Sequence, residues 1–483
     1  MNLYEDVDKV VLGEIYSSSE CLKNLEIMCD EFGSRFPGTS GDRKVIDFMV
    51  NKFKEYGLTD VHAEEFTIPG WIRGSSKLEI VSPIKREIDC IALPGSPNGT
   101  VEATLIDLGD GPIEIYEGRK DEIEGNVVIV TSRTPSGMTR PLHRTEKLNR
   151  SILSGASGFI FMNHYPAFGP PTGSVSTVIP SIGISHEEGK YLLRSLKRFS
   201  KLMVRISTQC ENRDVTTWNV IADLKGTTDD EEYVIVGAHY EGHDIAVGAI
   251  DSGSGACSVL EIARALSKVK EKIKRRIRFV CFSAEEIGLW GSKNYVKSHK
   301  DELKNLRFMF NLDAAGGKGE KGVEVHCWPE LEPYFKQIGE ETNAVIPVYQ
   351  KASPYSDHWP FLVKGVPTAS MGDPEAFRRR GGRGYGHTRF DTVDKIDIRY
   401  LWEAAANGAR ILLRVANTDD WPVKHRKKEA VQKIIEEQGY NETLNLSEKL
   451  VEYLSKKRLT PEVNGYLIRL QDSLSTSKHE FQI

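Results

Sequence analysis

Residues 233–251, YVIVGAHYEGHDIAVGAID, give the clearest indication of the fold. The first six of these residues are apolar or small without interruption, which is typical of a strand buried on both faces of a sheet. The apolar run ends at His239, and Asp251 opens the helix expected over 253–270. A buried strand that leads through a loop into a helix predicts one strand–helix step of an α/β domain.

The same step recurs further along the chain. Apolar segments of strand length lie at 277–284, 308–313, 323–328 and 367–371. Helical periodicity appears near 288–300 and over 398–416. The alternation predicts an α/β fold with a mixed, mostly parallel sheet sandwiched by helices.

Residues 76–212 have a different character. Short β-like segments dominate there, and a Pro/Gly-rich loop follows them at 165–174. We therefore expect a small β-rich domain at 76–212, inserted into a main domain made of 1–75 and 213–420. Residues 421–483 are polar with amphipathic helical patterns, which predicts a C-terminal helical extension. That extension packs either on the main domain or on a second subunit, so a homodimer is one option.

Composition and charge exclude several classes of protein. The chain has 64 Lys and Arg against 69 Asp and Glu, a net charge of −5, so nucleic-acid binding is not expected as its main role. It has no apolar run long enough to span a membrane, and its first residues lack the pattern of a signal peptide. The seven cysteines are scattered and lie mostly inside apolar runs, so a cytoplasmic location with reduced thiols is expected.

Polar side chains follow the predicted strands where each strand ends. In open α/β sheets, ligands bind beyond the carboxyl ends of the strands. The residues that fall there are His239, Asp251, Glu285, Glu286, Asp313 and His387. One such residue alone is more often structural, but buried like charges repel one another unless a cation lies between them. Imidazole and carboxylate without thiolate favour zinc, or a similar divalent ion such as Co²⁺ or Mn²⁺, and the number of ligands suits two ions.

Several ordered motifs give the chain a family resemblance. They are GAHYEGHDIAVGAIDSGSG, FSAEEIGLWGSKNY, NLDAAGG, YSDHWPF and GHTRFDTVDKID. This set resembles the co-catalytic zinc exopeptidases of peptidase family M28, and is most similar to its carboxypeptidase Q-like branch. The resemblance covers about 15–75 and 213–416. The inserted region resembles the protease-associated (PA) domain that many members carry.

The resemblance implies a role for each matching residue. His239 and Asp313 would bind one zinc, Glu286 and His387 would bind the other, and Asp251 would bridge both. Glu285 would be the general base, which takes a proton from the bridging water and passes it to the leaving amine.

One position departs from the family pattern. Members usually have an Asp two residues after the first His, where it orients the imidazole, and this chain has Glu241 there. Either Glu241 reaches the ring with its extra methylene, or Asp244 takes its place.

Other nearby residues have less certain roles. Asp357 and Asp391 are expected to support the site from behind, and His358 is equally compatible with a substrate contact and with a structural role. His243, in the loop beyond His239, is not counted among the ligands. The arginines between 378 and 383 suit a mobile loop, or one that binds a peptide carboxylate.

The expected function is hydrolysis of the terminal bond of a short peptide. Aminopeptidase activity is favoured, and a carboxypeptidase or dipeptidase with the same mechanism is the alternative. Hydrolysis of amino-acid amides and cyclisation of N-terminal glutamine are known in relatives of the fold. A catalytically inactive binding module on a peptidase scaffold is the alternative from another class.

Overall fold

The computed structural model describes residues 3–138, 140–175, 178–373 and 384–456. The chain forms two compact units. The first comprises Met1–Ile68, Val215–Gly386 and Phe390–Ile434, and the second Pro69–Asp214, His387–Arg389 and Ile435–Ile483. The segment expected as an insert lies within the second unit, and the segment expected as a C-terminal extension is divided between the two. Over the described residues, no helix has the length and apolar character that crossing a membrane requires.

An eight-stranded sheet forms the centre of the first unit. In spatial order its strands are β1 (Thr59–Ile72), β10 (Glu211–Leu224), β12 (Arg276–Phe282), β11 (Tyr233–His239), β13 (Leu306–Asn311), β16 (Thr368–Gly372), β14 (Gly322–Val325) and β15 (Val348–Gln350). The four strands β12, β11, β13 and β16 run parallel, whereas β10 pairs antiparallel with β12 and β14 pairs antiparallel with β16. The mixed, mostly parallel sheet expected from the sequence is confirmed.

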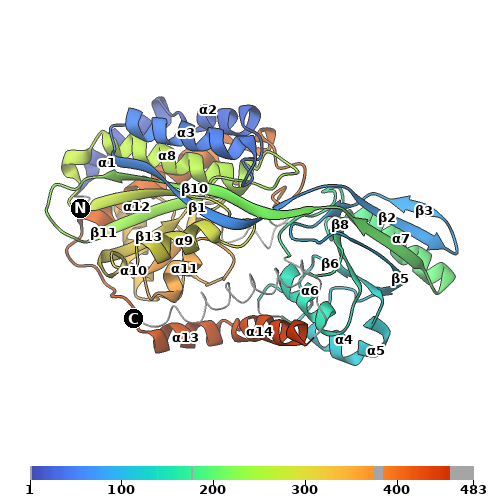
Figure 1. The fold of residues 1–483 in the computed structure, drawn as a ribbon. Coiled ribbons are helices and arrows are strands. Elements are labelled where there is room, and N and C mark those ends of the chain that lie inside the picture. Colours follow the sequence, from blue (N-terminus) through green and yellow to red (C-terminus); the bar gives the residue numbers. More distant parts are fainter. Residues whose placement is uncertain (1–2, 139, 176–177, 374–383, 457–483) are drawn as a thin grey trace. The chain divides into compact units, whose positions relative to one another are not determined.

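Helices cover both faces of this sheet, which explains why its central strands are apolar throughout. Val234, Ile235 and Val236 of β11 are all fully buried. On one face, α8 (Ser254–Ser267) packs on β11 and on its neighbours α1 (Glu5–Ser17), α2 (Cys21–Glu26), α3 (Ser40–Glu55) and α12 (Ile398–Asn417) (Figure 1). The opposite face carries α9 (Trp290–Ser298) and α11 (His358–Val363), whose Tyr295 and Phe361 join the core formed with β11 and β12.

The remaining elements of the first unit are short helices, together with one helix that continues into the second unit. They are η1 (Ile27–Glu31), η2 (Ala249–Gly253), η3 (Lys270–Lys272), η4 (Leu303–Asn305), η5 (Val393–Lys395), α10 (Leu331–Glu341) and α13 (Lys428–Glu437).

The second unit contains its own eight-stranded sheet. In spatial order its strands are β3 (Arg86–Ile88), β2 (Ser76–Ser82), β9 (Met203–Thr208), β5 (Gly99–Asp107), β6 (Val127–Thr131), β7 (Gly158–Met162), β8 (Ser181–Ile184) and β4 (Ile91–Ala92). Its helices are α4 (Ile113–Gly118), α5 (Lys120–Ile123), α6 (Arg144–Leu153), α7 (His186–Phe199) and α14 (Asn441–Ser455).

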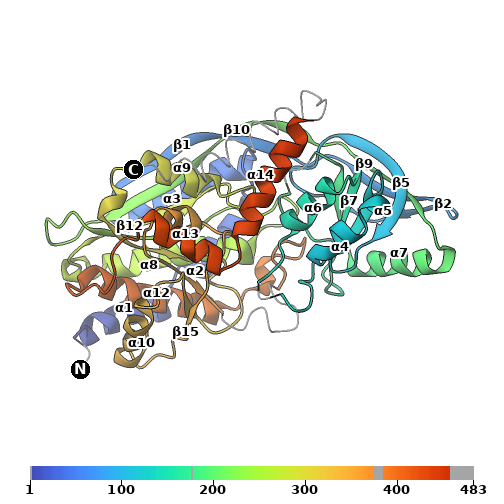
Figure 2. The same cartoon turned by 90° about the horizontal axis from the view of Figure 1, so that it is seen from below.

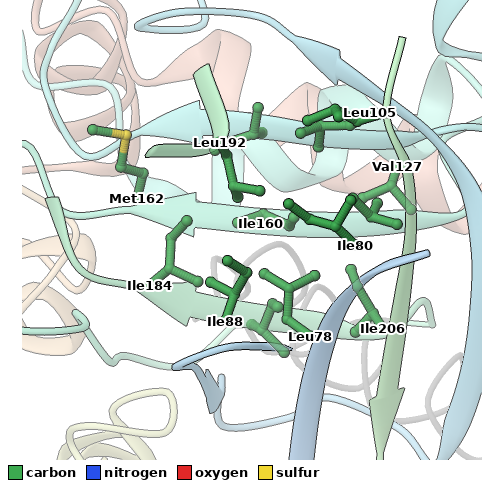
Figure 3. Close-up of a cluster of buried hydrophobic side chains, with 14 of the residues drawn as sticks. Leu78, Ile80, Ile88, Leu105, Val127, Ile160, Met162, Ile184, Leu192 and Ile206 are labelled. Atoms are coloured by element: carbon green, nitrogen blue, oxygen red, sulfur yellow. The ribbon is translucent and has the colours of Figure 1, made fainter. Parts of the chain in front are cut away.

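Apolar side chains on both faces of this second sheet give the unit a core of its own. One cluster includes Leu78, Ile160 and Leu192, which come from β2, β7 and α7 (Figure 3). On the other face, α14 packs beside α6, and its Leu450 and Leu454 enter a cluster with residues of α6 (Figure 2). Part of the C-terminal segment is therefore a component of the second unit's core.

Candidate metal centre

The carboxyl ends of three parallel strands bring the predicted site residues together in the first unit. His239 is the last residue of β11 and lies level with Phe282 at the end of β12. Asn311, at the end of β13, pairs with Gly237 of β11. Glu285 therefore lies three residues past β12 and Asp313 two residues past β13, at the same edge of the sheet.

Left-handed residues turn the chain sharply beside two of these side chains. Ala284 has a φ of 58° and immediately precedes Glu285, and Ala314 has a φ of 52° and immediately follows Asp313. A residue other than glycine rarely adopts this conformation, and such strain is concentrated at functional sites. The strained backbone beside Glu285 and Asp313 therefore fits a functional role for these two side chains.

His239 stands at the centre of a buried group of carboxylates. Its Nε2 lies 3.2 Å from Asp313 Oδ1, 3.3 Å from Asp251 Oδ1 and 4.0 Å from Glu285 Oε2. The side chain of His239 is fully buried, and those of Asp251, Glu285 and Asp313 are 2%, 9% and 17% exposed. His239, Glu285 and Asp313 each offer a ligand atom, all within 4.8 Å of one another, as a metal ion requires.

The protonation equilibria show that this cluster attracts positive charge. Burial opposes the charged form of His239, yet the carboxylates of Asp313, Glu241 and Glu285 raise its pKa well above the ordinary value. Burial also raises the pKa of Glu285 well above its ordinary value, despite the opposing effect of His239. A cation between these groups would relieve the repulsion among the carboxylates.

The separations between the donor atoms fit zinc. Zinc–nitrogen and zinc–oxygen bonds of about 2.0–2.2 Å in a tetrahedron place ligand atoms about 3.3–3.6 Å apart. The distances from His239 Nε2 to Asp251 Oδ1 and Asp313 Oδ1 are 3.3 and 3.2 Å, close to that range. The donor set of imidazole and carboxylate therefore fits a divalent ion of the zinc type.

Glu286 points to a different partner from Glu285. Its Oε2 lies 2.8 Å from Nε2 of His243, and both side chains are almost completely buried. The sequence pattern did not place His243 at the site, because nothing in its spacing shows how the loop beyond β11 folds back. The adjacent residues Glu285 and Glu286 therefore belong to two different groups: Glu285 lies near His239, and Glu286 lies beside His243.

Glu241 contributes to the site in a way that the sequence did not predict. The ring Nδ1 of His239 lies 3.1 Å from the backbone carbonyl oxygen of Glu241, and 3.7 Å from its Oε2. The other carboxylate oxygen of Glu241, Oε1, accepts hydrogen bonds from the backbone N–H groups of Glu285 (2.5 Å) and Glu286 (3.3 Å). The orienting role falls to the carbonyl, while the carboxylate fixes the segment that bears both glutamates. Asp244 is half-buried in the same loop.

Further groups hold the ligands in place. Asp391 accepts hydrogen bonds from the backbone N–H groups of Ile250 (2.7 Å) and Asp251 (3.1 Å), and burial raises its pKa to about 7. Ser356 donates to Asp313 Oδ2 over 2.7 Å, which fixes the orientation of that carboxylate. Such supporting hydrogen bonds tune the affinity of metal sites.

Two residues of the YSDHWPF motif, Asp357 and His358, are buried. Burial raises the pKa of Asp357 to about 7, and the charge of His239 acts in the opposite direction. His358 stacks on His326 with ring centroids 3.6 Å apart, and its Nε2 lies 2.9 Å from the carbonyl oxygen of Ser353. The structure favours a structural role for His358.

His387 belongs to the second unit. Its Nδ1 lies 3.2 Å from the carbonyl oxygen of Thr172, and its own carbonyl oxygen accepts a hydrogen bond from Thr172 N–H over 2.9 Å. Its backbone is also left-handed, with a φ of 61°. Its predicted part in binding metal with Glu286 stays a prediction. The arginines predicted between 378 and 383 lie outside the described residues.

Comparison with known proteins gives one consistent family. Residues 219–412 match the sequence profile of Peptidase family M28. Carboxypeptidase Q of Mus musculus is 24% identical over 436 residues, covering 86% of this chain and 90% of the mouse protein. Aminopeptidase YwaD of Bacillus subtilis is 26% identical over 406 residues, covering 80% and 83%.

A solved structure supports the same assignment. A Peptidase M28 precursor from Shewanella amazonensis superimposes with a TM-score of 0.73 at 26% identity, covering 87% of this chain and 98% of that one. The matched range, 219–412, includes the positions of His239, Asp251, Glu285, Glu286 and Asp313. Residues 219–412 therefore match peptidase family M28, the family of metal-dependent exopeptidases that the motifs of this chain resemble.

Proposed function

We propose that the protein hydrolyses the terminal peptide bond of short peptides with two zinc ions, and that it is an aminopeptidase. The observation that carries the proposal is the position of His239 Nε2, 3.2–3.3 Å from carboxylate oxygens of Asp251 and Asp313 in a buried site. His239 and Asp313 would hold one zinc, Glu286 and His387 would hold the other, and Asp251 would be a ligand shared by the two. When bound, the ions lower the pKa of a shared water and polarise the scissile carbonyl.

Glu285 is the general base in this mechanism. Burial raises its pKa, which makes its carboxylate a better proton acceptor than an exposed glutamate. Glu285 takes the proton from the attacking water and delivers it to the amine that leaves. Glu241 keeps Glu285 in reach of the water, because its carboxylate binds the Glu285 backbone N–H.

The charge of the site supports recognition of a free amino terminus. Five carboxylates gather near the strand ends of the first unit: Glu241, Asp251, Glu285, Glu286 and Asp313. Two divalent cations would leave one negative charge uncompensated, and such a site favours an ammonium group over a carboxylate. The similarity to aminopeptidase YwaD of Bacillus subtilis also supports cleavage at the amino terminus.

A carboxypeptidase or dipeptidase is the second candidate, supported by the similarity to carboxypeptidase Q over most of both chains. Zinc-loaded enzyme should be given one short peptide in three forms: with both ends free, N-blocked and C-amidated. If only the N-blocked form survives, the protein is an aminopeptidase, as proposed. Survival of only the C-amidated form would establish a carboxypeptidase, and survival of both blocked forms a dipeptidase. If metal-loaded protein cuts none of the three, the proposal is wrong and an inactive binding module becomes the better account.

A further inference from the structure

The loop that leads away from His239 is closed by two glycines in contact. A Cβ atom on Gly242 would lie 2.5 Å from Cα of Gly248, and one on Gly248 would lie 2.6 Å from Cα of Gly242. Gly248 also has a left-handed φ of 56°, which other residues rarely adopt. The close approach folds the chain back on itself, with His243 directly after the first glycine.

A buried arginine fixes both ends of the same loop. Arg35 is fully buried, and its guanidinium donates to the carbonyl oxygens of Tyr240 (2.6 Å), Val247 (2.6 Å) and Gly248 (3.0 Å). Gly242 adds a hydrogen bond from its N–H to the carbonyl oxygen of Ser34 over 2.8 Å. A fully desolvated cation holds this loop, so the position of His243 is specified by the fold.

The position that results places an imidazole beside a predicted metal ligand. His243 Nε2 lies 2.8 Å from Glu286 Oε2, and the two side chains are 3% and 2% exposed. In a site with five or six ligands, bonds of about 2.1 Å at right angles place neighbouring donor atoms about 3.0 Å apart. The observed separation suits two adjacent ligands of one ion, and it also suits a simple hydrogen bond, so the two must be separated by experiment.

We propose that His243 is a ligand, through Nε2, of the divalent ion that Glu286 binds, an inference that rests on the proposed two-metal function. The family resemblance assigns no ligand to this position. A neutral imidazole adds a donor without adding negative charge, at a site that already gathers several carboxylates. His243 thus strengthens metal binding without further repulsion among the ligands.

Three variants test the assignment. His243→Ala removes both the ligand and any hydrogen bond. His243→Gln keeps a side chain that donates a hydrogen bond to Glu286 but is a poor zinc ligand. His299→Gln is the matched control, because His299 Nε2 also lies 2.8 Å from a carboxylate oxygen, Glu64 Oε1, outside the cluster.

Each purified protein is stripped of metal and titrated with Zn²⁺ and with Co²⁺, following ions bound per chain and the visible absorption of Co²⁺. We expect wild type and His299→Gln to bind two ions with the same affinities. We expect both His243 variants to lose at least tenfold in affinity for one ion, and to change the Co²⁺ spectrum of that site.

The outcomes separate the ligand assignment from the proposed function. If His243→Gln binds both ions as wild type does, His243 only donates a hydrogen bond to Glu286 and the assignment is wrong. If the Ala variant misfolds, the Gln variant still decides the matter. If wild type binds no metal and cuts no peptide, the proposed function fails and the ligand assignment fails with it.

Discussion

The stacked pair of His326 and His358 predicts a specific loss of stability in acid. His326 is fully buried, its Nδ1 lies 2.9 Å from Thr368 Oγ1, and its ring stacks on His358 with centroids 3.6 Å apart. Burial lowers the pKa of His326 from 6.5 to about 3, and the charge of Lys351 acts in the same direction. The folded protein therefore keeps His326 neutral in a range where the unfolded chain takes up a proton.

The sign and size of the effect follow from this difference in pKa. Because the pKa of His326 is depressed in the folded state, its contribution to stability is present above pH 6.5 and is lost as the pH falls toward 3. From pH 7 to pH 5 the loss from His326 amounts to about 2 kcal/mol. Burial also lowers the pKa of His358 well below its ordinary value, so the stability that His358 loses in acid has the same sign.

Urea unfolding of wild type and His326→Gln at pH 7 and pH 5 measures this effect. Removing the titrating group should reduce the drop in unfolding free energy between the two pH values by about 2 kcal/mol. His62→Gln is the control, because the His62 side chain is 40% exposed, and it should lose as much stability as wild type. If wild type and His326→Gln lose the same stability between pH 7 and pH 5, the assignment of a buried neutral histidine is refuted.

Three further substitutions test how the site is supported. Gly242→Ala should destabilise the protein by about 2–4 kcal/mol in urea unfolding, because its Cβ would collide with Gly248; wild-type stability would contradict the loop contact. Arg35→Met should cost about 3 kcal/mol or more, because several buried carbonyl groups lose their donor, and a neutral effect would show that they find other partners. Ser356→Ala should weaken zinc binding by about tenfold without unfolding the chain, because Asp313 loses its orienting hydrogen bond; an unchanged zinc titration would contradict this role.

The sequence predicted the parallel core because local pattern and final environment agree there. The segments at 233–238, 277–284 and 308–313 became β11, β12 and β13, whose residues are apolar because helices cover both faces. β10 was not predicted, since it begins with an unbroken polar run that contains Asn212, Arg213 and Asp214. Pairing with β12, about sixty residues away along the chain, specifies it instead.

At the site, the sequence could predict the residue types but could not assign atoms to partners. That Glu241 orients His239 through its carbonyl oxygen depends on the path of the loop, not on the length of the Glu241 side chain. That path is set by Arg35, more than two hundred residues earlier, and by the contact between Gly242 and Gly248. The position of His243 beside Glu286 has the same cause, so the motif spacing alone did not reveal it.

Two-zinc hydrolysis with Glu285 as the base is tested by peptide turnover of metal-stripped, zinc-reloaded and Glu285→Gln protein, with bound zinc measured in the same samples. Stripping should abolish turnover, and zinc should restore it. Glu285→Gln should bind two zinc ions as wild type does, while turnover falls by about 10² to 10⁴-fold. Unchanged turnover in the zinc-loaded Glu285→Gln protein, or full turnover without metal, would contradict this mechanism.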